Sequence, residues 1–352
     1  MLICPACGYL NPMHNKYCQE CGADLQDFAE SLTDKNWQLD AGDLELHDPT
    51  ISNPNLITVA SGIPAKHRLV RLDWAAATDR GRQRQRNEDD FYVSYQIHSL
   101  QTKNRNLTTV SRGLFVVCDG MGGHAGGEIA SAMAIAGIAD QFNNFSVEQL
   151  PDGDRLIAMI RQVNQTIYLQ NEQNSRQDYR RMGTTMVLLA LHNTDITLAH
   201  VGDSRIYRIG DTPKPFYEQL TRDHEVGNRL IDQGVPPEVA WARPDAHQLT
   251  QAIGPNEKSR VDPAINSFRL TENTLFLLCS DGLCDNGVVD NHWKTHLLPL
   301  LSPAYDLQQG VEDVLALGNE MNGHDNLTAI LVRCLVEKIA EGDTTPNSQT
   351  FP

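Results

Sequence analysis

Several aspartates in this sequence stand beside glycines or in short polar loops, and three of them closely follow apolar runs. They are Asp89, Asp119, Asp203, Asp281 and Asp325. Carboxylate oxygens are hard ligands that suit magnesium and manganese, and few basic residues stand among them. A single aspartate of this kind is equally well explained as a solvated turn residue. The recurrence of the pattern favours a cluster of metal ligands.

The elements that must position these carboxylates are short buried strands. Residues 114–118, 196–201 and 275–279 are apolar runs with the length and β-branched content of such strands. Residues 126–141 carry small and apolar residues at helical spacing, so a strand, an acid, a glycine turn and a helix follow one another around Asp119. The glycines allow positive φ and let a metal or ligand approach the backbone. This order of elements would hold a carboxylate rigidly at a strand end.

Five segments that contain these aspartates resemble, in this order, the motifs of the metal-dependent protein phosphatase 2C family. The bacterial form is the most similar, because residues 119–124 read Asp-Gly-Met-Gly-Gly-His. The resemblance extends from about Asp73 to about Val336, roughly three quarters of the chain. It implies a four-layer sandwich of two antiparallel β-sheets flanked by helices, whereas the periodicity of the sequence alone indicates only an α+β fold.

The resemblance also implies the ligands of two manganese or magnesium ions. Asp119 would bridge the two ions. Asp89 and the carbonyl of Gly120 would bind one of them, and Asp281 and Asp325 would bind the other. Members of this family hydrolyse phosphoserine and phosphothreonine esters in proteins by attack of a water that bridges the metals. The implied activity is therefore that of a metal-dependent serine/threonine protein phosphatase acting on phosphorylated proteins.

Other residues match further positions of the family's site. Asp203, together with Asp281, matches a third and weaker metal position. Arg84 matches the arginine that binds the substrate phosphate, since a planar guanidinium suits phosphate oxygens. His124 would protonate the leaving alkoxide, because imidazole titrates near neutral pH. Three residues would act around these groups by orienting waters and ligand carboxylates: Glu88, Asp285 and Asn326.

The composition limits the classes of partner. The chain has 352 residues, 40% of them hydrophobic, and a formal net charge of −16. That length suits one large domain and a small one. The negative charge argues against binding to nucleic acid or to an anionic membrane surface, which needs basic patches. Neither a signal peptide nor an apolar run long enough to cross a bilayer is recognisable, so we expect a cytoplasmic protein without membrane contact.

Two Cys-x-x-Cys pairs near the N-terminus predict a structural zinc ion in a zinc ribbon. The four ligands would be Cys4, Cys7, Cys18 and Cys21. A glycine follows each pair and permits the turn around the metal, and four thiolates complete a tetrahedral shell. Disulfides are the alternative, but they need an oxidising compartment. Because this segment has one lysine, Lys16, and no arginine, we expect it to contact a protein partner rather than nucleic acid.

The remaining four cysteines fall in or beside apolar strand patterns, and we expect them to be buried thiols. They are Cys118, Cys279, Cys284 and Cys334. By composition, the chain divides into the zinc ribbon (1–22), a largely unstructured acidic linker (23–70), the catalytic domain (71–338) and a C-terminal tail (339–352).

Within the domain, residues 223–249 form an excursion over the site that resembles the family's flap, and residues 221–224 are expected to cap a helix there. Strands are expected at 74–79, 182–191 and 327–336, and helices at 154–174 and 305–319. Two other functions stay open at this point. One is a phosphoprotein-binding scaffold or adaptor that uses the zinc ribbon, and the other is a phosphatase for small metabolites.

Overall fold

The computed structural model describes residues 67–339, except 102–106, 123–125, 177–180 and 258–259, and two short strands nearer the N-terminus. Those strands, β1 (Leu2–Ile3) and β2 (Leu10–Asn11), pair in antiparallel orientation. The expected zinc ligands Cys4, Cys7, Cys18 and Cys21 lie outside the described residues, as do most of the expected linker and tail and the candidate acid His124.

A six-stranded antiparallel sheet forms one half of the domain. Its strands are β4 (Asp89–Gln101), β5 (Leu107–Met121), β6 (Gly183–Thr184), β7 (Met186–His192), β8 (Asp195–Val201) and β11 (Ala264–Arg269). The order across the sheet is β11-β8-β7-β5-β4, and β6 pairs with β5. The segment expected as one strand is thus divided at Thr185, whose N–H donates to the Asp119 carbonyl oxygen at 2.8 Å.

A five-stranded antiparallel sheet forms the other half. Its strands are β3 (His67–Asp79), β9 (Arg205–Gly210), β10 (Phe216–Gln219), β12 (Thr274–Cys279) and β13 (Leu327–Lys338), in the order β10-β9-β12-β13-β3. Both β3 and β13 are longer than the sequence pattern indicates. They pair with each other from Asp79 opposite Leu327 to His67 opposite Lys338, with a register shift at Leu335 and Val336. The pairing itself extends these strands past their apolar positions.

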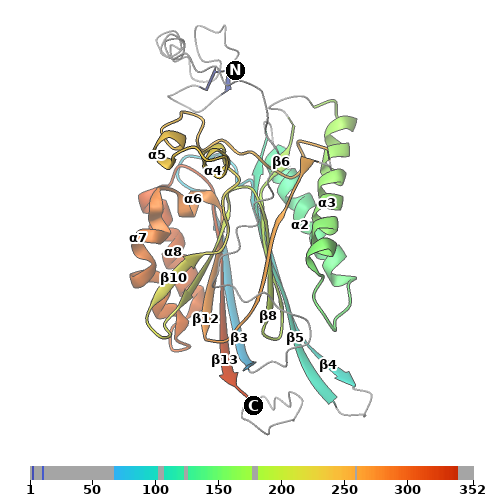
Figure 1. The fold of residues 1–352 in the computed structure, drawn as a ribbon, viewed down its shortest axis with the longest axis vertical. Helices are drawn as coiled ribbons and strands as arrows, with labels where there is room; N and C mark the ends of the chain where they lie inside the picture. The colour runs from blue at the N-terminus through green and yellow to red at the C-terminus, as the bar shows by residue number, and fades with distance from the viewer. Residues whose placement is uncertain are drawn as a thin grey trace.

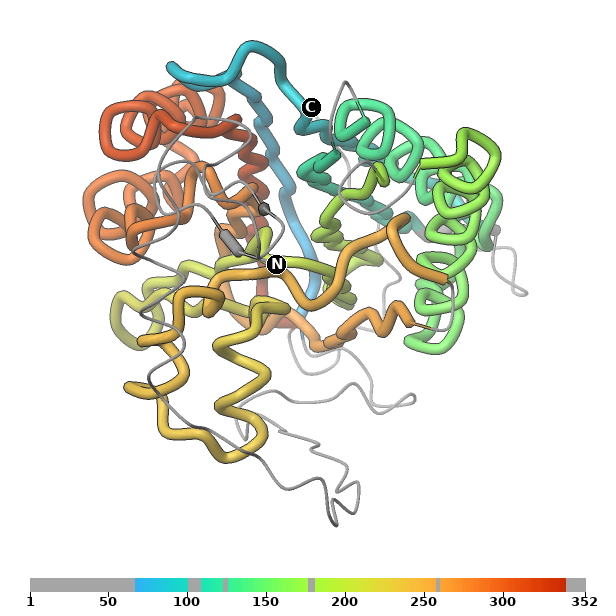
Figure 2. Tube along the Cα trace, turned by 90° about the horizontal axis from the view of Figure 1, so that it is seen from above, coloured from blue at the N-terminus to red at the C-terminus, as the bar shows by residue number. Residues whose placement is uncertain are grey.

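Helices cover the outer face of each sheet (Figures 1 and 2). On the six-stranded sheet lie α2 (Gly126–Asn143) and α3 (Gly153–Gln173). On the other lie α6 (Asp281–Cys284), η3 (Asp285–Gly287), α7 (Val288–His292), η4 (Trp293–Leu297), η5 (Leu298–Leu301) and α8 (Leu307–Met321). The short helices of 281–301 are absent from the sequence expectation, because none is long enough to show a helical period.

Three layers of apolar side chains hold these four layers together. One lies between α2 and α3 and the six-stranded sheet, one lies beneath α7 and α8, and the central one lies between the two sheets. Phe115 and Phe276 are fully buried in the central layer. The α+β sandwich of two antiparallel sheets flanked by helices is therefore confirmed. The four cysteines expected to be buried thiols are buried and free: Cys118, Cys279, Cys284 and Cys334.

The flap comprises α4 (Val226–Asp232) and α5 (Pro237–Ala240), which lie together at one end of the domain between β10 and β11 in the chain (Figure 1). The expected cap at 221–224 is wrong, because Glu225 is the N-cap residue and makes no side-chain capping bond. Asp223 is instead buried and paired with Arg205. No helix in the described ranges is long and apolar enough to cross a membrane.

Candidate active site

A pocket of about 260 Å³ lies where strand ends of the two sheets meet. Its walls include most of the residues that the sequence singles out, together with four others. They are Arg84, Glu88, Asp119, Gly120, Met121, Gly122, Thr185, Asp203, Leu249, Asp281, Asp325 and Asn326. The turn after β8 supplies Asp203, the first residue of α6 is Asp281, and Asp325 precedes β13. The fold thus brings together carboxylates that lie more than 200 residues apart in sequence.

Asp89 and Asp119 are direct cross-strand neighbours. Asp89 is the first residue of β4 and pairs with Asp119 near the end of β5. Residues opposite each other in an antiparallel pair share a face of the sheet, so both carboxylates point the same way. Asp89 lies just behind the pocket wall, where Ser280 Oγ donates a hydrogen bond of 2.7 Å to its Oδ2. The strand pairing thus places the two carboxylates side by side at one end of the sheet.

The electrostatics of the pocket are those of negative charges held together away from water. Burial, reinforced by the neighbouring carboxylate of Asp281, raises the pKa of Asp119 and of Asp203 well above the usual range. Burial also raises the pKa of Asp89 to about 7 and that of Asp281 to about 6. A bound divalent cation would favour the charged carboxylates and offset this cost.

Unpartnered oxygens test whether these residues fit a cation. Oδ1 of Asp89 and Oδ1 of Asp281 are both buried without a hydrogen-bond partner. A buried carboxylate oxygen without a donor is costly, and a hard cation would satisfy it. The chemistry of the donor set therefore fits magnesium or manganese. In the described part of the chain, however, no group of three or more His, Cys, Asp and Glu side chains forms a ready-made metal site.

The carboxylate of Asp325 is held in an ion pair at the rim of the pocket. Arg84 Nη2 donates a hydrogen bond of 2.6 Å to Asp325 Oδ2. The residue expected to bind phosphate and a residue expected to bind metal are therefore paired with each other. The guanidinium is half exposed at the rim of the pocket. A phosphate arriving from solvent could therefore reach it and replace the Asp325 carboxylate.

Hydroxyl groups to which the sequence analysis assigns no role fix the backbone that carries the carboxylates. Thr185 Oγ1 accepts from the Asp119 N–H at 3.0 Å, and Thr184 Oγ1 donates to the Asp119 carbonyl oxygen at 2.9 Å. Ser131 Oγ of α2 donates to the Glu88 carbonyl oxygen at 2.7 Å. The Gly-Thr-Thr run before β7 is the signal that could have identified the first two.

Asn326 and Asp285 make contacts that the sequence does not predict, while their expected roles toward waters and ligand carboxylates stay predictions. Asn326 Oδ1 accepts from the Glu88 N–H at 2.8 Å, and its amide donates to the carbonyl oxygens of Arg80 and Arg86. It therefore holds the loop before β4 as well as lining the pocket. Asp285 is not among the residues that line the pocket. Its charge interacts with Arg205, and burial raises its pKa.

The glycine after Asp119 is required by a close approach of two backbones. A Cβ on Gly120 would lie 2.3 Å from the Gly127 carbonyl oxygen and 2.5 Å from the Glu88 carbonyl oxygen. No real Cβ contact is that short, so a side chain here would push β5 away from α2. Glycine at this position lets the strand, the helix and the Glu88 loop meet beside the carboxylates.

Comparisons with known proteins agree with this architecture. The family model of protein phosphatase 2C matches residues 96–331. Serine/threonine phosphatase stp of Listeria welshimeri is 32% identical over 267 residues, which cover 74% of this chain and 96% of the relative. Protein phosphatase PhpP of Streptococcus pneumoniae strain D39 is 31% identical over 263 residues, covering 74% and 97%.

A solved structure is also similar. The catalytic domain of the serine threonine protein phosphatase PstP, in complex with two manganese ions, is 29% identical and superposes with a TM-score of 0.55. The match covers 76% of this chain and 99% of that one.

Proposed function

This chain belongs to the protein phosphatase 2C family, and we propose that the carboxylates of the Asp119 pocket hold two manganese or magnesium ions for its serine/threonine phosphatase activity. The observation that carries the site assignment is the pair of buried, unpartnered oxygens on Asp89 and Asp281. They lie beside two further carboxylates, Asp119 and Asp203, whose pKa is raised by burial. The manganese ions of the similar PstP structure support the choice of metal.

The metal ligands would be the residues that the motifs single out. They are Asp89, Asp119, the carbonyl of Gly120, Asp281 and Asp325, with Asp203 at a third position. When bound, the ions would offset charge on the phosphoryl oxygens and acidify water. Asp325 contacts Arg84 through Oδ2, and release of that contact would free the oxygen for a metal and the guanidinium for a phosphate.

Hydrolysis adds a water oxygen to phosphorus, breaks the bond from phosphorus to the serine or threonine oxygen, and leaves phosphate and a free hydroxyl. Arg84 would bind two phosphoryl oxygens with its planar fork and so orient the ester. His124 would donate a proton to the departing serine or threonine oxygen. Glu88 lines the pocket beside Arg84 and would orient water by accepting its hydrogen bonds.

The first experiment compares hydrolysis of a phosphothreonine peptide with manganese, with excess chelator, and by Asp119→Asn. Turnover that requires manganese and is lost in the variant supports the assignment. Glu320→Gln, on the exposed side of α8, is the control for loss of one carboxylate. Absence of turnover by folded, manganese-loaded protein on several peptides would contradict the proposal and favour a phosphoprotein-binding adaptor.

We also propose that Cys4, Cys7, Cys18 and Cys21 bind a structural zinc ion and that this ribbon contacts a protein partner. The spacing of the two Cys-x-x-Cys pairs supports the zinc site. Metal analysis of the purified chain should find one zinc per molecule, and replacement of Cys4 and Cys7 by serine should remove it without loss of manganese-dependent turnover. Zinc retained by that double variant would refute the assignment.

A further inference from the structure

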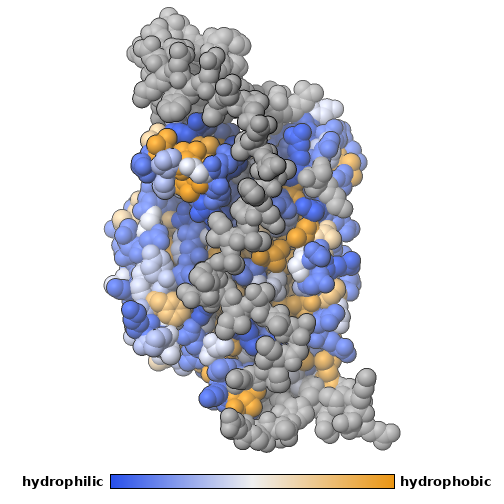
Figure 3. Space-filling view, in the orientation of Figure 1, coloured by the Kyte–Doolittle hydropathy of each residue, from blue (hydrophilic) through white to orange (hydrophobic). Residues whose placement is uncertain are grey.

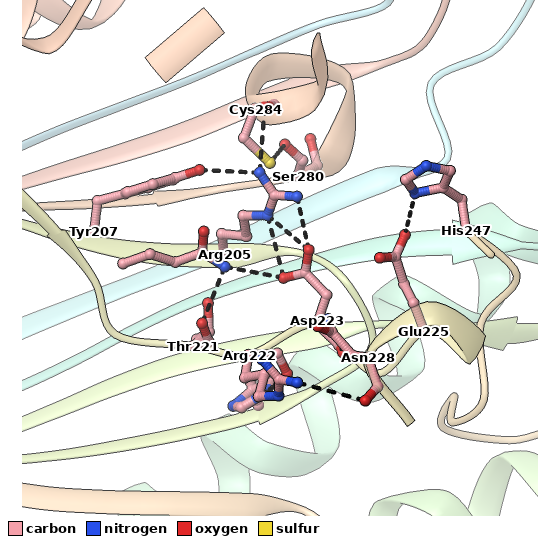
Figure 4. Close-up of polar contacts among 12 residues, drawn as sticks. Arg205, Tyr207, Thr221, Arg222, Asp223, Glu225, Asn228, His247, Ser280 and Cys284 are labelled. Carbon is pink, nitrogen blue, oxygen red and sulfur yellow. Dashed lines mark hydrogen bonds and ion pairs between the residues drawn. The ribbon is translucent and has the colours of Figure 1, made fainter. Parts of the chain in front are cut away.

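A second pocket, of about 550 Å³, is lined by residues of the flap and of the strands next to it. Figure 4 shows most of its polar side chains and their contacts. Side chains from β9, the end of β10, the segment between β10 and α4, α4 itself and the segment after α5 line the pocket. They are Arg205, Gln219, Thr221, Arg222, Asp223, Glu225, Asn228, Trp241 and His247. The volume falls in the range of ligand-binding cavities, and the lining is mainly polar and charged. The reaction described above uses none of these residues.

The two arginines of this pocket already have acidic partners. Arg205 contacts Asp223 through Nε and Nη2, at 2.7–3.1 Å, and Arg222 Nη2 lies 2.8 Å from Asp232 Oδ1. Arg205 also donates to the Tyr207 hydroxyl. A further anion would have to displace one of these carboxylates, so the pocket is poorly suited to a second phosphate.

Glu225 is the acid of this pocket with the weakest partner. Its side chain is about nine-tenths buried, and its one ion-pair partner among the described residues is His247, whose side chain is 80% exposed. Burial raises the pKa of Glu225. A cation with a fixed charge would pair with this carboxylate better than an exposed imidazole does.

Trp241 gives the pocket an aromatic wall. Its ring stacks on His247, with centroids 5.3 Å apart and planes 25° apart, and it packs closely against Gly227 of α4. Val239 and Trp241 are partly exposed, and Figure 3 shows apolar atoms on this part of the flap. His247 thus stacks on Trp241 while its Nδ1 lies 3.1 Å from Glu225 Oε1. A guanidinium could make the same two contacts with a permanent charge.

The two pockets are neighbours, because residues that line one are joined to residues that line the other. Glu225 forms a β-bridge with Leu249, which lines the catalytic pocket. Asp203 lines the catalytic pocket and Arg205 the second one, and they lie two residues apart in the chain. Two residues of extended backbone span about 7 Å, so a peptide bound at the catalytic pocket could reach the second pocket with a nearby side chain.

We propose that this second pocket binds an arginine of the phosphoprotein substrate, within about three residues of the phosphorylated one. The arginine displaces His247, stacks on Trp241 and pairs with Glu225. This inference rests on the phosphatase activity proposed above and adds a substrate preference to it. The net charge of −16 also favours the approach of basic segments of a substrate.

The test uses phosphothreonine peptides with a single arginine, or a single citrulline, at one of the three positions before or the three positions after the phosphothreonine. Citrulline keeps the shape of arginine and removes its charge. We expect kcat/KM to be about tenfold higher for the arginine peptide at one or more positions, the size expected for one charge-assisted hydrogen bond and a cation–π contact at a partly exposed site. Glu225→Gln and Trp241→Leu should each lower that ratio by a factor of about three, and the double variant should lower it to near one.

Glu238→Gln is the matched control, because Glu238 is an exposed carboxylate of α5 that does not line the pocket. It should keep the arginine-to-citrulline ratio of the original chain, because it removes one carboxylate of the flap and leaves the pocket lining intact. The ratio itself cancels any general loss of activity in a variant. Equal kcat/KM for arginine and citrulline at every position, or an equal loss of preference in Glu238→Gln, overturns the subsite. Failure to hydrolyse any peptide would instead refute the phosphatase assignment on which it rests.

Discussion

Arg84 and Asp325, the two residues assigned to phosphate and to metal, form an ion pair across the rim of the catalytic pocket, with Nη2 and Oδ2 2.6 Å apart. The contact raises the pKa of Arg84, against the opposing effect of burial. It also neutralises a carboxylate that would otherwise add to the negative charge of Asp89, Asp119 and Asp281. The phosphate role of Arg84 and the metal role of Asp325 are therefore linked by this ion pair. Mutation of Arg84 alone can show how each role depends on the other.

Arg84→Ala should lower kcat/KM for a phosphopeptide by about a hundredfold, because a donor to the phosphoryl oxygens is lost. The manganese concentration for half-maximal activity should stay the same or fall, since Asp325 loses its competing partner. Manganese titrations of steady-state rates measure both quantities. Arg86→Ala, at an exposed arginine two residues on, is the control. A large rise in the manganese requirement of Arg84→Ala would mean that the arginine organises the metal ligands.

Asp119→Asn should stabilise the protein in chelator while it removes activity. Asp119 is buried beside Asp89 and Asp281, so replacement of its carboxyl by an amide relieves repulsion and desolvation. We expect the free energy of unfolding at pH 8 to rise without metal. Manganese should then no longer raise the melting temperature, as measured by calorimetry. A variant less stable than the original chain in chelator would argue that Asp119 is held by favourable contacts instead.

Asn326→Ala should be strongly destabilising. Three side-chain hydrogen bonds are lost, and three backbone groups of the loop before β4 lose a partner. At about 0.5–1.5 kcal/mol for each bond, the cost is about 2–4 kcal/mol by chemical denaturation. Asn273→Ala, which removes one exposed hydrogen bond to Val336, should cost less than about 1 kcal/mol. A loss no larger than that of Asn273→Ala would show that water replaces these contacts.

The sequence was sufficient for the apolar strands and for the acids at their ends. The apolar runs that end at Cys118 and Cys279 have the composition of buried strands. Asp119 and Asp281 follow closely in the chain, so their places at the strand ends follow directly. Tertiary pairing decided the rest. The ends of β3 and β13 depend on each other's backbone, which no local pattern records.

Two further differences arise from contacts between distant segments. Asp223 resembles a helix cap in sequence, yet the distant Arg205 captures its side chain, and the helix begins later at Val226. Thr185 resembles an ordinary strand residue until the fold places it beside the Asp119 backbone. The ion pair of Arg84 with Asp325 joins residues 241 apart in sequence and could not be predicted from either motif.

His224 should make stability depend on pH. Burial, with a smaller contribution from His200, lowers its pKa from 6.5 to about 3 in the folded state, and its Nδ1 accepts from the Gly202 N–H. The unfolded chain therefore binds a proton as pH falls through 6.5 while the folded state does not. The stabilisation is present above pH 6.5 and is lost as pH falls toward 3.

The free energy of unfolding of the original chain should fall between pH 6.5 and 5.0. In His224→Gln that fall should be about 2 kcal/mol smaller. Denaturant titrations in chelator at the two pH values measure it. The glutamine oxygen can still accept from Gly202. His247→Gln, at an exposed histidine, is the control for removal of one imidazole. Equal slopes for the original chain and His224→Gln would mean that His224 is accessible to protons in the folded state.

Gly120→Ala should disrupt the catalytic pocket although it adds only one methyl group. The new Cβ would meet the carbonyl oxygens of Gly127 and Glu88 at 2.3 and 2.5 Å, so β5 must move away from both α2 and the Glu88 loop. Both contacts are to backbone, which cannot rotate aside as a flexible side chain can. Asp119 and Glu88 would separate, and we expect manganese-dependent turnover to fall by at least about tenfold, since misplacement of about 1 Å can cost a hundredfold.

Gly153→Ala is the matched control for this substitution. Gly153 begins α3, and its Cβ would find its nearest neighbour 3.7 Å away, so activity and stability should be unchanged. Metal affinity, measured by calorimetric titration of manganese, distinguishes displaced ligands from a merely unstable fold. If Gly120→Ala bound manganese and turned over substrate like the original chain, the strand and helix could separate at no cost to the site, and the close approach would serve packing alone.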